Sequence, residues 1–249
     1  MSWLLAAEEL CPEVQAGEPG LPGLTLQVPA RGIHCMVGGR AQGREAYLKT
    51  LAGIIPPAAG DLTLLGHPLV GLSETPGGLL GKQLGYVARQ APLLSVLNGR
   101  ENAVMPAIYH GAKRKEAEQA LEPLLAEVNY RGNLLQLPAY MSALEKMQLA
   151  LVRALLLQPR LLVLEDPWFS LELPDYALLD QGIRNWGQRM AVVVATDNLG
   201  FVRQNADQIV FVGSSQCLTF ANWQALVTSG QPEVVDYLQH YRSAIDWKV

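Results

Sequence analysis

Two runs of uninterrupted apolar residues stand out in the pattern of the chain. Residues 161–164 are Leu-Leu-Val-Leu, and residues 190–195 are Met-Ala-Val-Val-Val-Ala. Runs without alternation are typical of strands buried on both faces of a parallel sheet. The first run leads directly into Glu165, Asp166 and Pro167. Because α/β folds bind ligands beyond the carboxyl ends of their strands, the pattern predicts a core strand that ends at a binding site. A core strand that ends in two solvated acids is the alternative.

Helical periodicity dominates residues 98–157. Residues 113–127 combine mixed charge with apolar spacing near 3.6, which predicts a surface helix. A second helix is expected over residues 142–157, where Ser142 can serve as N-cap and Glu145 can complete a capping box. Further helices are predicted over residues 174–188 and, as one or two elements, over the tail 221–249.

The first 90 residues combine strands, turns and one helix. Residues 2–30 predict short strands punctuated by turns such as Gly17–Gly20. A buried strand over 32–38 is followed by a glycine-containing turn and a helix over 46–53, with Gly53 as C-cap. Strand, glycine turn and helix follow one another in phosphate-binding loops. Residues 54–90 and 208–220 predict further turns and short strands.

The pattern therefore predicts an α/β protein with a mostly parallel core sheet, an antiparallel β subdomain and a helical insert. The expected segments are a β subdomain and loop-bearing core over 1–90, a helical subdomain over 91–157, a second part of the core over 158–220, and a helical tail over 221–249. An insert of roughly 60 residues falls within the usual size of a domain.

Composition excludes several classes of function. A net charge of −4 argues against nucleic acid as the main partner. Three scattered cysteines offer neither a disulfide framework nor zinc spacing, so we expect no metal site and a reducing compartment. The N-terminus lacks the basic region of a signal peptide, and no apolar stretch is long enough to span a membrane. We therefore expect a cytosolic protein.

Nearly the whole chain resembles the nucleotide-binding subunits of ABC transporters. The motifs that carry the resemblance follow one another in the family's order: a Walker A region at 33–53, a strand pair at 57–66, the Q-loop at Gln90, the "E-N" segment at 100–102, the signature helix at 141–155, Walker B at 158–167 and the switch at 195–202. The resemblance implies the P-loop NTPase-like fold of an ABC ATPase.

The Walker A region departs from the family pattern where chemistry is needed. Gly38 and Gly43 remain, but Arg44 replaces the lysine, Glu45 the magnesium-binding hydroxyl and Ala46 the neighbouring threonine. Arginine is not equivalent to lysine in a tight phosphate cradle. A carboxylate about 4 Å from a phosphate costs on the order of 1–4 kcal/mol. That Glu45 binds magnesium itself is the alternative.

The other motifs are degraded in the same direction. Glu165 and Asp166 invert the family's order of magnesium ligand and general base, and Asp197 replaces the switch histidine. The signature keeps its serine but loses both glycines and the glutamine; its residues here are Ser142, Ala143, Leu144 and Glu145.

These departures predict a site without working nucleotide chemistry. We expect the carboxylates of Glu45, Glu165, Asp166 and Asp197 to converge, with Arg44 as their counter-charge. Arg44 is predicted to pair with Glu165 or Asp197 and to fill the phosphate position itself. No catalytic residue and no cofactor is expected, and binding of ATP with magnesium is disfavoured without being excluded.

Two segments indicate the kind of transporter. Residues 97–111 resemble ATPases of lipid and lipoprotein export, and residues 226–238 are similar to the tail of the Mla-type (MCE-linked) lipid transporter ATPases, where it reaches the partner subunit. A generic closing helix is the alternative for the tail. The resemblance further implies a homodimer or heterodimer on the cytoplasmic face of the inner membrane. A permease would dock in a groove near Gln90–Asn98.

Three functions remain open on the sequence. The first is a non-catalytic, structural or regulatory subunit of a membrane transporter, with lipid as the expected substrate. The second is a slow ATPase or ATP-binding switch that uses Glu165 and Asp166 in exchanged roles. The third is a soluble interaction module that has left transport.

Overall fold

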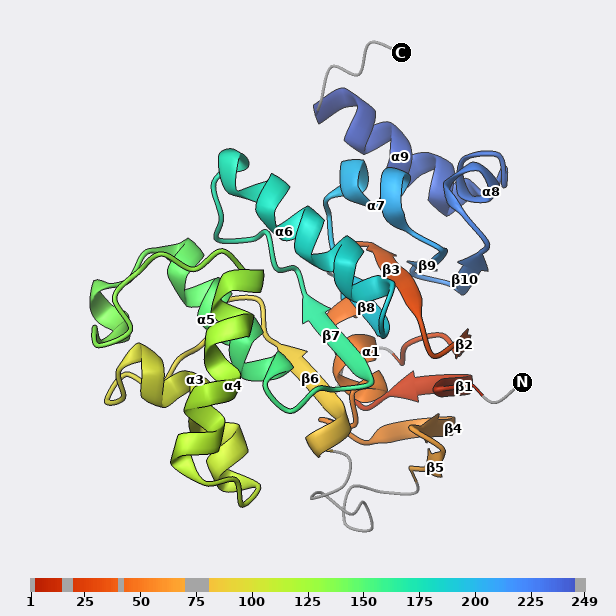
Figure 1. Ribbon diagram of the computed structural model, residues 1–249. Coiled ribbons are helices and arrows are strands. Elements are labelled where there is room, and N and C mark those ends of the chain that lie inside the picture. The colour runs from red at the N-terminus through yellow and green to blue at the C-terminus, as the bar shows by residue number, and fades with distance from the viewer. Residues whose placement is uncertain (1–2, 15–19, 40–42, 70–80, 245–249) are drawn as a thin grey trace. The chain divides into compact units, whose positions relative to one another are not determined.

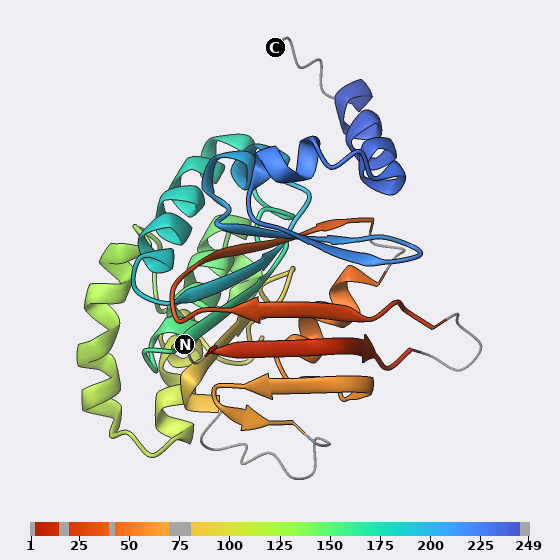
Figure 2. The ribbon, with the colours of Figure 1, turned by 90° about the vertical axis from the view of Figure 1, so that its right-hand side faces the viewer.

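The computed structural model describes residues 3–14, 20–39, 43–69 and 81–244 (Figures 1 and 2). The chain forms two compact units. The first consists of Met1–Thr75 and Val194–Val249, and the second of Pro76–Val193. The predicted turn at Gly17–Gly20 and the centre of the glycine turn, residues 40–42, lie largely outside the described residues.

The first unit contains a four-stranded antiparallel sheet, whose strands are the red and orange arrows of Figure 2. Its order is β2 (Leu24–Val28), β1 (Leu5–Pro12), β4 (Pro57–Leu64) and β5 (His67–Pro68). In β2 the residues alternate between buried and exposed, as expected for a sheet with one wet face. This sheet is the antiparallel β subdomain that the sequence predicted.

Three further strands of this unit pair with one another, and two of them, β3 and β9, are largely buried. β3 (Gly32–Gly38) pairs in parallel with β9 (Gln208–Val212), and β10 (Cys217–Phe220) pairs antiparallel with β9. Helix α1 (Arg44–Leu51) follows β3. The predicted C-cap, Gly53, lies one residue beyond the observed C-cap Ala52 and has φ of 69°, which a glycine adopts without strain.

The remaining helices of the first unit come late in the chain. They are α7 (Leu199–Asn205), α8 (Trp223–Val227) and α9 (Pro232–Ala244). Asn198 caps α7, because its side-chain oxygen accepts a hydrogen bond from the Phe201 amide. Asn222 caps α8 in the same way. The described part of the tail therefore forms two helices, where one or two were predicted.

The second unit combines a parallel strand pair with four long helices. β6 (Leu84–Val87) pairs in parallel with β7 (Leu161–Glu165). The helices are α3 (Gly99–Tyr109), α4 (Arg114–Glu127), α5 (Ala143–Leu155) and α6 (Leu173–Gly187), and a 3₁₀ turn spans Pro138–Tyr140. Helices α3, α4 and α5 pack on one another, and α5 also contacts β6.

The two apolar runs form strands, as the sequence predicted. Every residue of β7 and of β8 (Ala191–Ala195) is buried, and β8 begins in the second unit and ends in the first. The boundaries of the two units, after residues 75 and 193, differ from the boundaries of the four predicted segments, after residues 90, 157 and 220. The strands β6 and β7 belong with the helices, because α5 packs on β6.

Candidate functional site

The turn between β3 and α1 is shaped by two glycines. Gly38 has φ of 116°, and a Cβ atom there would lie 2.2 Å from the carbonyl oxygen of Val212. Gly43 is the N-cap of α1 with φ of 80°, and a Cβ there would lie 2.5 Å from the Leu21 side chain. Both glycines are therefore required by the packing of this chain itself, whatever the turn binds.

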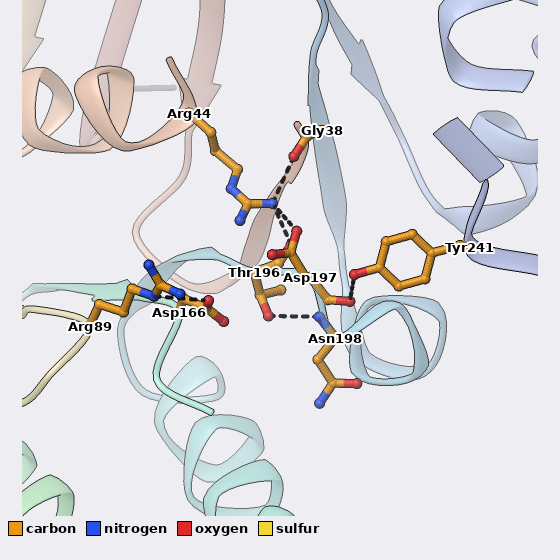
Figure 3. A network of polar contacts seen from close by, with 8 residues as sticks. All are labelled: Gly38, Arg44, Arg89, Asp166, Thr196, Asp197, Asn198 and Tyr241. Atoms are coloured by element: carbon orange, nitrogen blue, oxygen red, sulfur yellow. Dashed lines mark hydrogen bonds and ion pairs between the residues drawn. The ribbon is translucent and has the colours of Figure 1, made fainter. Parts of the chain in front are cut away.

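Arg44, at the lysine position, is turned into the first unit. Its side chain is 4% exposed. Nη1 lies 2.9 Å from the carbonyl oxygens of Gly38 and Thr196, and 2.7 Å from Oδ1 of Asp197 (Figure 3). Of the two predicted partners of Arg44, the structure shows Asp197. The hydrogen-bond acceptors of the guanidinium are thus groups of the protein itself, at the end of β3 and in the switch segment.

Glu45 lies on the exposed side of α1. Its carboxylate forms an ion pair with Lys49, one helical turn further on, and its side chain is 55% exposed. The expected convergence of four carboxylates therefore does not hold for Glu45. Ala46 is half-buried and brings no polar atom beyond its backbone. Neither position supplies the hydroxyl that holds magnesium in a working loop.

Hydrogen bonds within the first unit hold the switch segment in place. Thr196 is fully buried, and its amide donates to the carbonyl oxygen of Met36 on β3. The Asn198 amide donates to the Thr196 hydroxyl, and the Asp197 carbonyl accepts a hydrogen bond from the Tyr241 hydroxyl (Figure 3). Tyr241 was not predicted as a site residue, since only its position in an aromatic-rich tail pointed to it.

The acidic pair at the end of β7 is engaged inside the second unit. Glu165 and Asp166 are 8% and 7% exposed, so the alternative of two solvated acids is wrong. The Tyr86 hydroxyl on β6 donates to Oε2 of Glu165 at 2.7 Å. Asp166 has φ of 42°, a left-handed conformation that aspartate tolerates better than most residues.

Arg89 neutralises Asp166. Its Nε lies 3.5 Å from Oδ2 of Asp166 (Figure 3), and the guanidinium carbon lies 3.3 Å from the centre of the Phe169 ring. Neither Arg89 nor Tyr86 was predicted to be part of the site. Their position beside the Q-loop residue Gln90, which is exposed, was the available signal.

The signature region forms the predicted capping box. The Ser142 hydroxyl accepts from the Glu145 amide at 3.2 Å, and the Glu145 carboxylate accepts from the Ser142 amide at 2.7 Å. The start of α5 therefore carries an anion of its own at the positive end of the helix dipole. Ala143 is exposed, whereas Leu144 lines a small apolar cavity with Leu178 and Trp186 of α6.

Two positions of the Walker A region are engaged by partners within this chain. The phosphate-binding amine is replaced by a guanidinium that binds Gly38, Thr196 and Asp197. The magnesium-binding hydroxyl is replaced by a glutamate paired with Lys49. Within the described residues, no three histidine, cysteine, aspartate or glutamate side chains lie close enough together to hold a metal ion.

The sequence profile of the family described as "ABC transporter" matches residues 21–168, more than half of the chain. The chain therefore belongs to the ABC transporter family. It is 28% identical over 194 residues to the cell division ATP-binding protein FtsE of Haemophilus influenzae, covering 76% of this chain and 87% of FtsE. It is 29% identical over 202 residues to the lipoprotein-releasing system ATP-binding protein LolD of Hydrogenovibrio crunogenus, covering 79% and 88%.

Solved structures show the same fold. A dimeric structure of MJ0796, described as a bacterial ABC transporter cassette, matches with a TM-score of 0.77 at 16% identity, covering 87% of this chain and 98% of MJ0796. The predicted fold, an ABC ATPase cassette with mixed sheets and a helical insert, is thereby confirmed. Among the described residues, no helix combines the length and apolarity needed to cross a bilayer.

Proposed function

We propose that this chain is a catalytically degenerate nucleotide-binding-domain subunit of an ABC-type membrane transporter, with a structural or regulatory role and without efficient ATP hydrolysis. The position of Arg44 carries the proposal. A phosphate-binding lysine must present its charge to the ligand, whereas the Arg44 guanidinium is buried against Gly38, Thr196 and Asp197. Binding of a phosphate there would require these hydrogen bonds to break, and each contributes about 0.5–1.5 kcal/mol.

The end of β7 supports the same function. A general base needs a free lone pair within about 3 Å of its water. Asp166 faces Arg89, and Glu165 accepts the Tyr86 hydroxyl. A slow ATPase that uses these two acids in exchanged roles would have to displace both partners.

Titration calorimetry tests the proposal directly. We expect no detectable heat when magnesium and ATP are added to the purified chain up to millimolar concentration, because the cation at the phosphate position is already engaged. FtsE of Haemophilus influenzae, an ATP-binding relative, serves as the positive control under the same conditions. Binding at micromolar strength would refute the proposal and make Glu45 and Asp166 the next residues to replace.

A groove on the second unit suits a membrane partner. It has a volume of about 290 Å³ and is lined by Leu97, Glu101, Val104, Met105, Ile108, Tyr109 and Arg114. Exposed apolar side chains continue it toward Gln90, since Leu94 and Val96 are 45% and 82% exposed. It overlaps the predicted docking segment at Leu97. We propose that a short amphipathic helix of the permease binds here through its apolar face.

Replacing Ile108 with glutamate should abolish copurification with the permease. The substitution places a charge in the apolar lining, and the partner's apolar face would have to cover it. The measurement is recovery of an integral membrane protein with the tagged chain from detergent-solubilised membranes of its host.

Ile54→Glu is the matched control, because Ile54 is 44% exposed and lies in the other unit. It should leave recovery unchanged. Equal loss in both variants, or no loss in Ile108→Glu, would show that the groove is not the docking site.

The remaining features of the transporter are also proposals. A lipid or lipid-bearing substrate is supported by similarity to a lipoprotein-releasing system protein. The relatives reported above are FtsE and LolD proteins and are not specifically of the Mla (MCE-linked) type, so that type stays a prediction. Pairing with a second cassette, identical or intact, is supported by the dimeric MJ0796 structure. We further propose that the chain lies at the cytoplasmic face of the membrane, bound peripherally through the permease. An interaction module that has left transport would lack a permease altogether, which the copurification experiment tests.

A further inference from the structure

One face of helix α9 carries polar and aromatic side chains that contact the rest of the first unit. Glu233, Tyr237 and Tyr241 are spaced four residues apart in this 13-residue helix, so they lie along one face. Each of the three contacts a different part of the unit. Together they connect the tail of the chain to the segment that binds Arg44.

At the start of α9, Glu233 fills an anion-binding turn between β9 and β10. Its carboxylate accepts from the amides of Ser214 and Ser215 at 2.7 and 3.1 Å, and from their hydroxyls at 3.1 and 2.5 Å. These hydrogen bonds, the Ser215 hydroxyl first, lower the pKa of Glu233. A Cβ at Gly213 would lie 2.1 Å from the carboxylate and 2.8 Å from the backbone carbonyl oxygen of Gln216, so a larger residue there would disturb the turn.

In the middle of α9, Tyr237 packs on the core of the first unit. Its ring packs edge-on against Phe211 of β9, with centroids 5.5 Å apart, and lies 5.4 Å from the ring of Tyr241. Burial, followed by the charge of Asp197, raises the pKa of Tyr237 to about 12. The ring is therefore close to the ion pair between Asp197 and Arg44.

Toward the end of α9, Tyr241 binds the switch itself. Its hydroxyl donates to the carbonyl oxygen of Asp197, whose carboxylate receives Arg44 (Figure 3). Two residues therefore hold Asp197: Tyr241 of the tail binds its backbone carbonyl, and Arg44 binds its side-chain carboxylate. In this arrangement the tail and Arg44 fix the switch within one chain, and no bound nucleotide is needed.

Both apolar and polar contacts hold α9 in place. Among its described residues, Val234 is buried and Tyr237 packs on Phe211, whereas Val235 is 39% exposed. A helix near the end of a chain opens locally at a lower free energy than the core strands do. Opening of α9 would remove the Tyr241 hydrogen bond from Asp197.

We propose that α9 is an intramolecular latch that fixes the switch segment, residues 196–198, in a single conformation through Glu233, Tyr237 and Tyr241. Release of α9 is then the event that frees the switch to move, in place of nucleotide binding. The inference goes beyond the proposed function, because the latch would hold the switch whether or not the chain binds ATP.

Amide hydrogen exchange on the full-length chain tests the latch. The variants are Tyr241→Phe, which removes only the hydroxyl, and Glu233→Gln, which keeps the size of the side chain and removes its charge. In both, amides of residues 196–203 should exchange about threefold to tenfold faster, the effect of losing one neutral or charge-assisted hydrogen bond. Amides of β9, Gln208–Val212, should be unchanged.

Tyr109→Phe is the matched control, because Tyr109 is 84% exposed and lies in the other unit. It should leave exchange in residues 196–203 unaltered. Faster exchange in α9 alone, with the switch unchanged, would overturn the latch and leave α9 a passive closing helix. Equally faster exchange throughout the first unit would also overturn it, because that result reports global stability. The exchange measurement does not involve ATP. A negative result would therefore count against the latch alone and would leave the proposed function untouched.

Discussion

Replacing Arg44 with alanine should lower the free energy of unfolding by about 2–4 kcal/mol, the range for removing one partner of a buried, hydrogen-bonded charge. The substitution leaves the carbonyl oxygens of Gly38 and Thr196 without the guanidinium, and Asp197 without its cation. The Asp197 side chain is 33% exposed, so water can reach it and keeps the loss below that of a fully buried pair. Urea unfolding followed by circular dichroism measures the change.

Lys49→Ala is the control for this variant. Lys49 is also a cation of α1 paired with a carboxylate, but its partner Glu45 is 55% exposed. An exposed pair contributes about 0–1 kcal/mol, so the control should be nearly neutral. Similar losses in both variants would show that Arg44 is an ordinary surface cation and would remove the main support for the proposed function.

Replacing Arg89 with methionine should lower the free energy of unfolding by about 2–3 kcal/mol, through loss of the cation beside a buried carboxylate and of the contact with Phe169. Asp166, 7% exposed, would lose this cation while it stays in a left-handed conformation. Asp166→Asn should relieve most of this loss, because asparagine also tolerates that conformation and carries no charge. The double-mutant cycle, measured by urea unfolding, should give a coupling of about 1–2 kcal/mol.

The pair Arg114 and Glu118 on α4 provides the comparison for that cycle. Its side chains are 61% and 32% exposed, and the same substitutions there, Arg114→Met and Glu118→Gln, should give a coupling of about 0.3–0.5 kcal/mol. If the cycle at Arg89 and Asp166 shows no larger coupling, Asp166 is not neutralised by Arg89. It would then be free to act as a base, and the slow-ATPase alternative would gain support.

The order of elements was predictable because it depends on local pattern. The apolar runs at 161–164 and 190–195 had to be buried on both faces, and both form strands. The start of α5 followed from the spacing of Ser142 and Glu145, since a capping box is a contact between near neighbours in sequence. Glu45 and Lys49 are likewise four residues apart in a predicted helix, so their ion pair could have been predicted and was missed.

Partners distant in sequence were not predictable in the same way. Tyr86 meets Glu165 only because β6 and β7 are neighbours in the sheet, and no periodicity in the chain encodes that register. Tyr241 reaches Asp197 because the β9–β10 turn and Glu233 set the position of α9. The sequence predicted that the motif positions have lost their usual chemistry, and this stays a prediction. It could not indicate which side chains of the same protein now occupy them.

The capping box at the start of α5 bears on how degenerate motifs should be interpreted. Ser142 accepts from the Glu145 amide, and this contact stabilises the helix by about 0.5–2 kcal/mol whether or not a phosphate ever binds there. Selection for folding alone is therefore sufficient to retain a serine in the signature. Survival of that serine is evidence of an intact helix start. The two glycines of the family motif are not needed for this cap. Their replacement, by Ala143 and Leu144 in this chain, is therefore the better indicator of whether a chain still uses nucleotide.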